Sequence, residues 1–138
     1  MLREKSAQES VAVKMQENTK RKLVLAVDDE DLTREVLAQA LTVLGYQAVA
    51  VSNGEEALQL YLSRRPAAII TDIHMPKMNG LELLREVKKL DANLPVILIT
   101  GYDAGEARKA AESYGAKALL IKPFRIHELK DILVEVLK

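Results

Sequence analysis

Three carboxylates stand at the points where two short apolar runs of the chain end. Run 23–27 leads into Asp28 and Asp29, and run 68–71 leads into Asp72. If both runs are parallel strands of one sheet, their carboxyl ends meet at the edge where open α/β sheets bind ligands. Three carboxylates gathered there would repel one another and stay ionised only with a cation among them. The spacing therefore predicts a metal site built from oxygen ligands.

Two further apolar runs end on side chains that suit a phosphate. Run 95–99 is followed by Thr100, and run 118–121 is followed by Lys122. An all-oxygen site with positions left for water and a phosphate oxygen favours Mg²⁺, or Mn²⁺ in its place. One carboxylate can then attack phosphorus and form an acyl phosphate, with a hydrogen bond from Thr100 and a fixed positive charge from Lys122. The residue types predict phosphoryl transfer to a carboxylate.

The elements that must position these side chains alternate along the chain from residue 23. Apolar runs of strand length are expected at 23–27, 47–51, 68–71, 95–99 and 118–121. Amphipathic helices are expected at about 31–44, 54–65, 79–90, 104–114 and 126–138. The runs are apolar on both faces, as in parallel strands buried between two helical layers. The pattern predicts a doubly wound α/β sandwich of five strand–helix units.

Composition excludes several classes of protein. The 138 residues suit one domain, and 20 basic against 20 acidic residues argue against direct nucleic-acid binding. The absence of cysteine excludes disulfides, a thiol nucleophile and a Cys-based zinc site. No apolar stretch approaches the roughly 20 residues of a membrane span, and no signal-peptide core is present. We therefore expect a cytoplasmic protein without a membrane segment.

Residues 1–22 differ from the rest of the chain. They carry six basic and three acidic residues, contain no Gly or Pro, and end on the basic run 20–22. Their weak apolar periodicity predicts a flexible arm or a fraying helix that precedes one domain at 23–138. A partner-binding or dimerising segment is the alternative interpretation.

Four segments together resemble the receiver domain of two-component response regulators. They are VDDE (27–30), TDIHMPKMNG (71–80), LITGY (98–102) and IKPF (121–124). Each is common alone, but the four match the family in order and spacing, and the resemblance covers residues 23–138. It implies a flavodoxin-like (βα)5 sandwich whose parallel sheet has the strand order 2-1-3-4-5.

The resemblance also implies a role for each acid. Asp72 would be the phosphoacceptor. Asp29 and Asp72 would bind Mg²⁺ directly, Asp28 would orient a metal-bound water, and the backbone carbonyl of His74 would be the remaining protein ligand. Capping of the first helix by Asp28 or Asp29 is an alternative role for these two acids.

Further positions follow from the same resemblance. Thr100 matches the switch hydroxyl, and Lys122 matches the lysine that pairs with the acceptor, with a cis bond to Pro123. Receivers usually carry an aromatic residue three positions before this lysine, where the present chain has Leu119. We expect activation to depend less on a rotating ring than in the family at large, unless Tyr102 replaces it.

A receiver is a phosphoacceptor in signalling and not an enzyme in the usual sense. The resemblance implies a sensor histidine kinase or a histidine phosphotransfer protein as donor, and an unidentified output partner or onward phosphotransfer. Because the chain ends with its last helix, we expect a stand-alone receiver or a fragment of a longer protein, as a monomer or weak homodimer. A phosphohydrolase of the haloacid-dehalogenase type is a rival, but it needs an acid where His74 stands. A degenerate receiver scaffold is a second rival, against which the intact acids argue.

Overall fold

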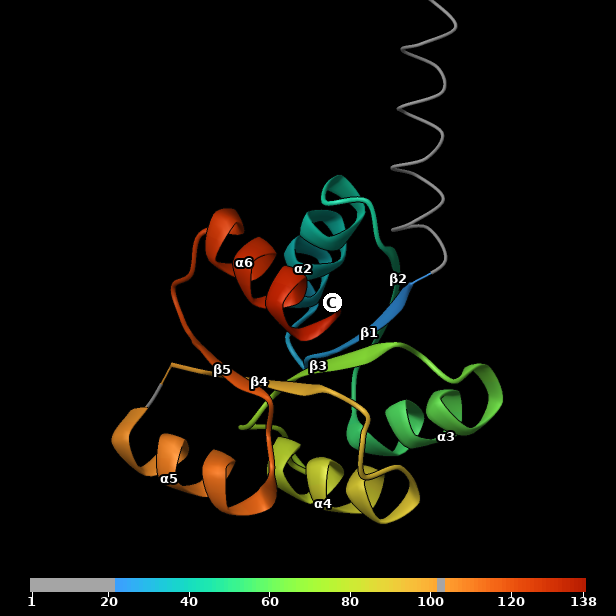
Figure 1. Ribbon diagram of the computed structural model, residues 1–138, viewed down its shortest axis with the longest axis vertical. Coiled ribbons are helices and arrows are strands. Elements are labelled where there is room, and N and C mark those ends of the chain that lie inside the picture. The colour runs from blue at the N-terminus through green and yellow to red at the C-terminus, as the bar shows by residue number, and fades with distance from the viewer. Residues whose placement is uncertain (1–21, 102–103) are drawn as a thin grey trace, which may run out of the picture.

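A five-stranded parallel sheet lies between two helical layers in the computed structural model, which describes residues 22–101 and 104–138 (Figure 1). The strands are β1 (Leu23–Val27), β2 (Gln47–Val51), β3 (Ala68–Asp72), β4 (Val96–Thr100) and β5 (Ala118–Ile121). They lie in the order β2-β1-β3-β4-β5, as predicted. Because β1 pairs with both β2 and β3, the winding reverses beside β1, and the chain ends of β1 and β3 face one crevice.

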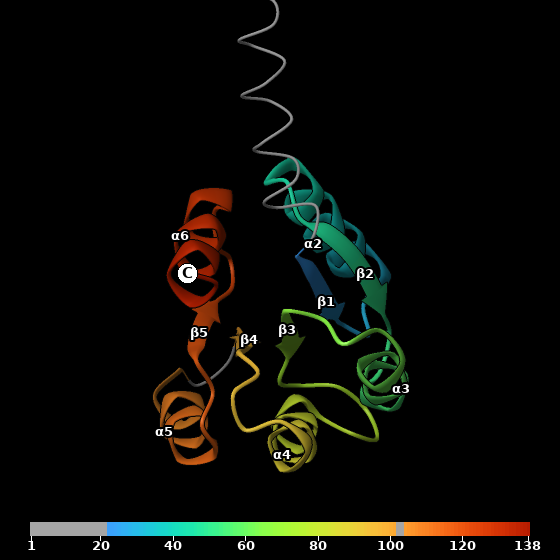
Figure 2. The ribbon, with the colours of Figure 1, turned by 45° about the vertical axis from the view of Figure 1, so that its right-hand side comes forward.

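Two helices cover one face of the sheet and three cover the other. Helices α2 (Asp31–Val43) and α6 (Ile126–Val136) lie on one side. Helices α3 (Gly54–Arg64), α4 (Gly80–Leu90) and α5 (Ala104–Tyr114) lie on the opposite side, as Figure 2 shows from a second direction. These bounds agree with the predicted helices to within about two residues. Gly45 and Gly115, at φ 95° and 82°, follow α2 and α5 in the left-handed conformation that ends many helices.

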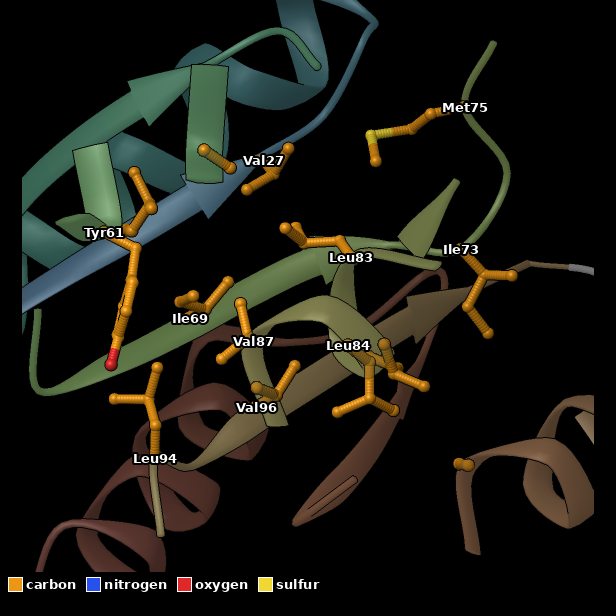
Figure 3. Close-up of a cluster of buried hydrophobic side chains, with 14 residues drawn as sticks. Val27, Tyr61, Ile69, Ile73, Met75, Leu83, Leu84, Val87, Leu94 and Val96 are labelled. Atoms are coloured by element: carbon orange, nitrogen blue, oxygen red, sulfur yellow. The ribbon is translucent and has the colours of Figure 1, made fainter. Parts of the chain in front are cut away.

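The core follows the two-residue period of the strands. On β1, Leu25 and Val27 pack among residues of α3 and α4, whereas Val24 and Ala26 pack among residues of α2 and α6. Figure 3 shows the first of these clusters, where side chains from β1, β3 and β4 lie beside side chains from α3 and α4. Each fully buried Leu, Ile or Val contributes about 1.5–3 kcal/mol by leaving water, so the sheet holds both layers.

The edges of the sheet differ from its centre. Every residue of β3 and β4 is buried, but β2 exposes Gln47 and Ala50, and β5 exposes Ile121. Both faces of these two strands nevertheless pack against a helical layer, with Val49 and Leu119 on one face and Ala48 and Leu120 on the other. Edge strands have one neighbour in the sheet, so the helical layers do not cover them completely.

A capping box and one backbone hydrogen bond fix the start of helix α4 near the end of β3. Asn79 Oδ1 accepts a hydrogen bond from Glu82 N at 2.9 Å, and Glu82 Oε1 accepts one from Asn79 N at 3.3 Å. Gly80 N donates to the Ile73 carbonyl at 2.9 Å. These bonds satisfy N–H groups that the start of a helix leaves unpaired, and they fix α4 against the segment after Asp72.

The predicted arm lies outside the described residues except for Lys22. Its Nζ donates to the carbonyl of Leu137, at the C-cap of α6, at 2.7 Å. A cation at this position also interacts favourably with the helix dipole. None of the helices within 22–101 and 104–138 combines the length and the apolar composition needed to cross a lipid bilayer.

A substitution in the loop after β3 should stabilise the protein. Lys77 has φ 64°, in the left-handed region that costs a residue with a Cβ on the order of 1 kcal/mol. We expect Lys77→Gly to raise the free energy of unfolding by about 0.5–1 kcal/mol, measured by urea denaturation without metal.

Arg65→Gly is the matched control. Arg65 has φ 48°, but its Nη1 donates to Tyr61 Oη at 3.0 Å and its guanidinium lies 5.0 Å from the Tyr61 ring centroid. Losing these contacts offsets the relief of strain, so no gain is expected there. An unchanged or lowered stability in Lys77→Gly would contradict the prediction.

Candidate functional site

Buried polar side chains gather at the carboxyl edge of the sheet. Among the described residues, those classed as buried and polar or charged are Asp28, Thr71, Asp72 and Thr100. All four lie at or directly after the ends of β1, β3 and β4. Burying a carboxylate is costly unless it is paired, so this concentration in an otherwise apolar core indicates a functional site.

The three predicted acids converge. Asp28, Asp29 and Asp72 each offer a carboxylate oxygen, and these oxygens lie within 4.8 Å of one another. We refer to these three residues as the acidic cluster. Asp28 is fully buried, Asp72 is nearly so, and Asp29 is exposed. Several hard oxygen donors with access to solvent on one side fit a divalent cation such as Mg²⁺, which retains part of its water shell.

Lys122 brings a positive charge into the acidic cluster. Its Nζ lies 2.8 Å from Asp72 Oδ2 and 3.4 Å from Asp28 Oδ2. The bond from Lys122 to Pro123 is cis, which confirms the expectation from the resemblance. Lys122 lies 50 residues after Asp72 and 94 residues after Asp28 in the sequence. These contacts therefore depend on the position of β5 beside β4 in the sheet.

The electrostatics of the site keep this amine charged. Burial by itself lowers the pKa of Lys122, but the hydrogen bond and charge of Asp72, together with Asp28, outweigh burial and raise it. The pKa of Asp28 is raised, first by burial and also by the charge of Asp72. The Glu30 N–H and Lys122 lower it, but not enough to cancel the effect of burial. A cation bound nearby would therefore stabilise the charged form of Asp28.

A backbone N–H and a side-chain amine hold the carboxylate of Asp72. The N–H of His74 donates to Asp72 Oδ1 at 3.1 Å, while Lys122 binds the other oxygen. The hydroxyl of Thr71 donates to the Asp72 carbonyl at 3.0 Å. Sequence reasoning missed this role of Thr71, although its place directly before Asp72 was visible. Asp72 is therefore held through both its side chain and its main chain.

The remaining predicted residues lie around this centre. Thr100 is buried at the end of β4, where it pairs in register with Ile121. His74 is exposed. Leu119 is half-buried in β5 and packs against the cluster beneath α3, α4 and α5. Tyr102 lies outside the described residues.

Neither Asp28 nor Asp29 caps helix α2. The N-cap residue is Glu30, whose side chain makes no capping hydrogen bond. Asp28 Oδ1 instead accepts the N–H of Glu30 at 2.9 Å, in a turn that precedes the helix. The capping alternative for these two acids is therefore wrong.

An open cleft extends from the acidic cluster across the start of α2. Its volume of about 930 Å³ is larger than a metal ion needs. The lining residues are Asp29, Glu30, Leu32, Thr33, Val36, Asp72, His74, Gly101, Lys122, Pro123 and Phe124. Leu32 and Val36, one turn apart on α2, are 73% and 54% exposed and form an apolar rim.

Sequence reasoning missed this apolar rim. Leu37 and Leu41 turn the buried face of α2 toward the sheet. The i, i+4 spacing of Leu32 and Val36 on another face was the available signal. Leu32 and Val36 thus place exposed apolar side chains directly beside the polar centre.

The amino-acid sequence is similar to those of two-component response regulators. A family model described as "Response regulator receiver domain" matches residues 24–134. Response regulator MprA of Mycolicibacterium vanbaalenii is 38% identical over 106 residues, covering 77% of this chain and 46% of MprA. Regulatory protein AtoC of Escherichia coli is 36% identical over 115 residues, covering 83% of this chain and 25% of AtoC. The chain spans less than half the length of these relatives.

Solved structures share the arrangement of the sheet and helices. Chemotaxis protein CheY4 of Vibrio cholerae has a TM-score of 0.79 at 31% identity, covering 83% of this chain and 98% of CheY4. The receiver domain of NtrX from Brucella abortus also has a TM-score of 0.79 at 31% identity, covering 83% of this chain and 97% of that domain.

Gly80 should tolerate no side chain. A Cβ at this position would lie 2.2 Å from the carbonyl oxygen of Asp72, a backbone atom that the sheet holds in place. We expect Gly80→Ala to lower the free energy of unfolding by about 1–3 kcal/mol, since one of the two segments must move.

Gly101→Ala is the control in the same site. A Cβ there would lie 3.6 Å from Lys122 Cβ, an ordinary contact. Urea denaturation of both variants measures the difference, and equal stability of the two would refute the steric argument.

Proposed function

Because the chain belongs to the response regulator receiver family, we propose that it accepts a phosphoryl group on Asp72 in a Mg²⁺-dependent reaction. Receiver domains are signalling domains of two-component systems and not conventional enzymes. The observation that carries the proposal is the buried Asp72 carboxylate, paired with Lys122 at 2.8 Å beside two further carboxylates. This arrangement combines a nucleophile, a fixed cation and a set of metal ligands.

Asp29 and Asp72 would hold the metal, with the His74 carbonyl as a further ligand and Asp28 acting through a bound water. When bound, Mg²⁺ supplies positive charge that attracts the phosphoryl donor and offsets charge on its oxygens. The oxygen donors of the acidic cluster support this assignment, because they are the ligands that Mg²⁺ prefers.

The proposed reaction forms an acyl phosphate. A carboxylate oxygen of Asp72 attacks phosphorus of a phosphohistidine, and the O–P bond forms as the N–P bond breaks. The electron pair of the broken bond stays on the imidazole nitrogen, which then takes a proton. The step needs no general base, because a carboxylate oxygen carries no proton that must leave as the O–P bond forms. Lys122 orients the carboxylate, and the Thr100 hydroxyl would donate to the new phosphate.

The donor is proposed to be a protein, namely a histidine kinase or a histidine phosphotransfer protein. Leu32, Val36 and Phe124 line the same cleft as Asp72. An apolar rim continuous with the acceptor suits a protein surface that presents a phosphohistidine, whereas a small phosphodonor would use the polar part alone.

Leu119 bears on how the phosphorylated state is transmitted. It packs among residues that include Ala107 and Ala111 of α5, and it presents no ring. A leucine changes rotamer at small cost in a packed seam and has no polar tip to hydrogen-bond at the surface. We therefore propose that the switch relies on movement of Thr100 and its loop more than on ring rotation.

Asp72→Asn tests the acceptor. Because an amide is not a nucleophile toward phosphorus, incorporation of radiolabelled phosphoryl from acetyl phosphate with Mg²⁺ should fall to background. Asp131→Asn, which alters an exposed acid of α6, is the control and should incorporate label normally. Equal labelling of wild type and Asp72→Asn would exclude Asp72 as the acceptor.

Asp29→Ala tests the metal site. Removal of this ligand should weaken Mg²⁺ binding by at least about tenfold, since loss of even an outer-shell partner typically costs that much. It should also raise the thermal stability of the metal-free protein, because repulsion within the acidic cluster is relieved. Titration calorimetry and melting in a chelator measure the two effects. Glu30→Ala, which removes the adjacent acid, is the control, and a similar result for both variants would place the metal elsewhere.

A further inference from the structure

Asp28 is held at each of its polar atoms. Its N–H donates to the Val51 carbonyl at 3.2 Å, and its Oδ1 accepts from Glu30 N at 2.9 Å. Its Oδ2 accepts from Lys122 Nζ at 3.4 Å, and its carbonyl oxygen accepts from Arg34 Nη1 at 2.8 Å. Two of these partners are side chains, Lys122 and Arg34. Lys122 also binds Asp72, whereas Arg34, among the described residues, binds no other residue of the acidic cluster.

Asp29, the next residue, is held quite differently. Its carboxylate is exposed and, within the part of the chain that the structure describes, forms no hydrogen bond or ion pair. Its position therefore depends on the backbone that carries it. The Asp28 carbonyl belongs to the planar peptide group joining Asp28 to Asp29. A hydrogen bond to that oxygen restrains the orientation of this peptide group, and therefore the direction in which the Asp29 side chain points.

Arg34 bridges the two ends of this loop. Its Nη1 binds the Asp28 carbonyl, and its Nη2 binds Asp31 Oδ1 at 2.5 Å in the first turn of α2. The Arg34 side chain is 21% exposed, whereas the side chain of Asp31 is 91% exposed. A planar guanidinium with several donors in fixed directions can make both bonds at once, which an ammonium cannot do in the same geometry.

We propose that Arg34 is a positioning residue for the metal site: its hydrogen bond to the Asp28 carbonyl holds the Asp28–Asp29 peptide so that the Asp29 carboxylate stays within the acidic cluster. The inference rests on the proposed function of the acidic cluster as a divalent-metal site. Arg34 itself touches neither the metal nor the phosphoryl group. It acts through the backbone of its neighbours.

Two physical effects of removing Arg34 have opposite signs. If Arg34 matters only as a nearby positive charge, its loss leaves residues 28–31, all acidic, with less compensation and should strengthen binding of a divalent cation. If Arg34 matters as a clamp, its loss frees the peptide before Asp29 and weakens binding. The direction of the change separates the two explanations.

The test is a titration with Mn²⁺ as the probe, following the free ion by electron paramagnetic resonance. Arg34→Met keeps the apolar stem and removes the guanidinium, and we expect an increase in Kd of about tenfold or more. Arg34→Lys keeps the charge but replaces the rigid guanidinium N–H with a rotating ammonium on a flexible stem, which holds the Asp28 carbonyl less firmly, so its Kd should lie closer to that of Arg34→Met than to wild type. Thermal unfolding in a chelator shows whether Arg34→Met folds. If it does not fold, the Kd of Arg34→Lys decides the question.

Two matched variants complete the experiment. Asp31→Asn breaks the exposed ion pair and leaves the carbonyl bond, so its Kd should stay within about twofold of wild type. Arg64→Met removes a positive charge from the end of α3 and should also leave the Kd unchanged.

The outcomes separate this inference from the proposed function. An unchanged or tighter Kd in Arg34→Met, a wild-type Kd in Arg34→Lys, or a loss in Asp31→Asn equal to that in Arg34→Met would overturn the role of Arg34 alone. Failure of the wild type to bind Mn²⁺ would overturn the metal site as well.

Discussion

Repulsion among three carboxylates within 4.8 Å of one another is the constraint on which the rest of this site depends. Two unit charges 4 Å apart interact by about 4 kcal/mol at an effective dielectric constant of 20, so the acidic cluster opposes folding unless positive charge is close. Lys122 supplies part of that charge, at 2.8 Å from Asp72. The raised pKa of Asp28 indicates that one amine does not fully compensate burial. A bound cation would therefore also stabilise the fold.

The surrounding structure holds the acids in place against this repulsion. Parallel pairing of fully buried strands brings the chain ends of β1 and β3 together, and the aliphatic core on both faces leaves these ends little freedom. Gly80 lets the start of α4 lie directly against the Asp72 carbonyl, and Arg34 closes the loop on the other side. The buried strands thus provide most of the stabilising contacts, while the acidic cluster lies at the edge of the sheet.

The same geometry connects chemistry to recognition. The cleft that holds Asp72 and Lys122 continues onto the exposed side chains of Leu32 and Val36. A partner that covers this rim would exclude water from the acceptor and bring its own reactive group over the carboxylate. The proposed phosphotransfer needs both parts, because the polar centre alone does not select one protein donor over another.

The sequence by itself determined the fold and predicted which residues meet at the carboxyl edge of the sheet. Strand ends follow directly from the apolar runs, so Asp28, Asp72, Thr100 and Lys122 could be assigned to one edge from local pattern alone. Tertiary structure decided what that pattern leaves open. Lys122 lies nearer to Asp72 than to Asp28, and Arg34 donates a hydrogen bond to the Asp28 carbonyl. Both contacts depend on how the elements that carry these side chains pack in three dimensions. Exposure of β2 and of the α2 rim likewise depends on where neighbouring layers end, which no local periodicity encodes.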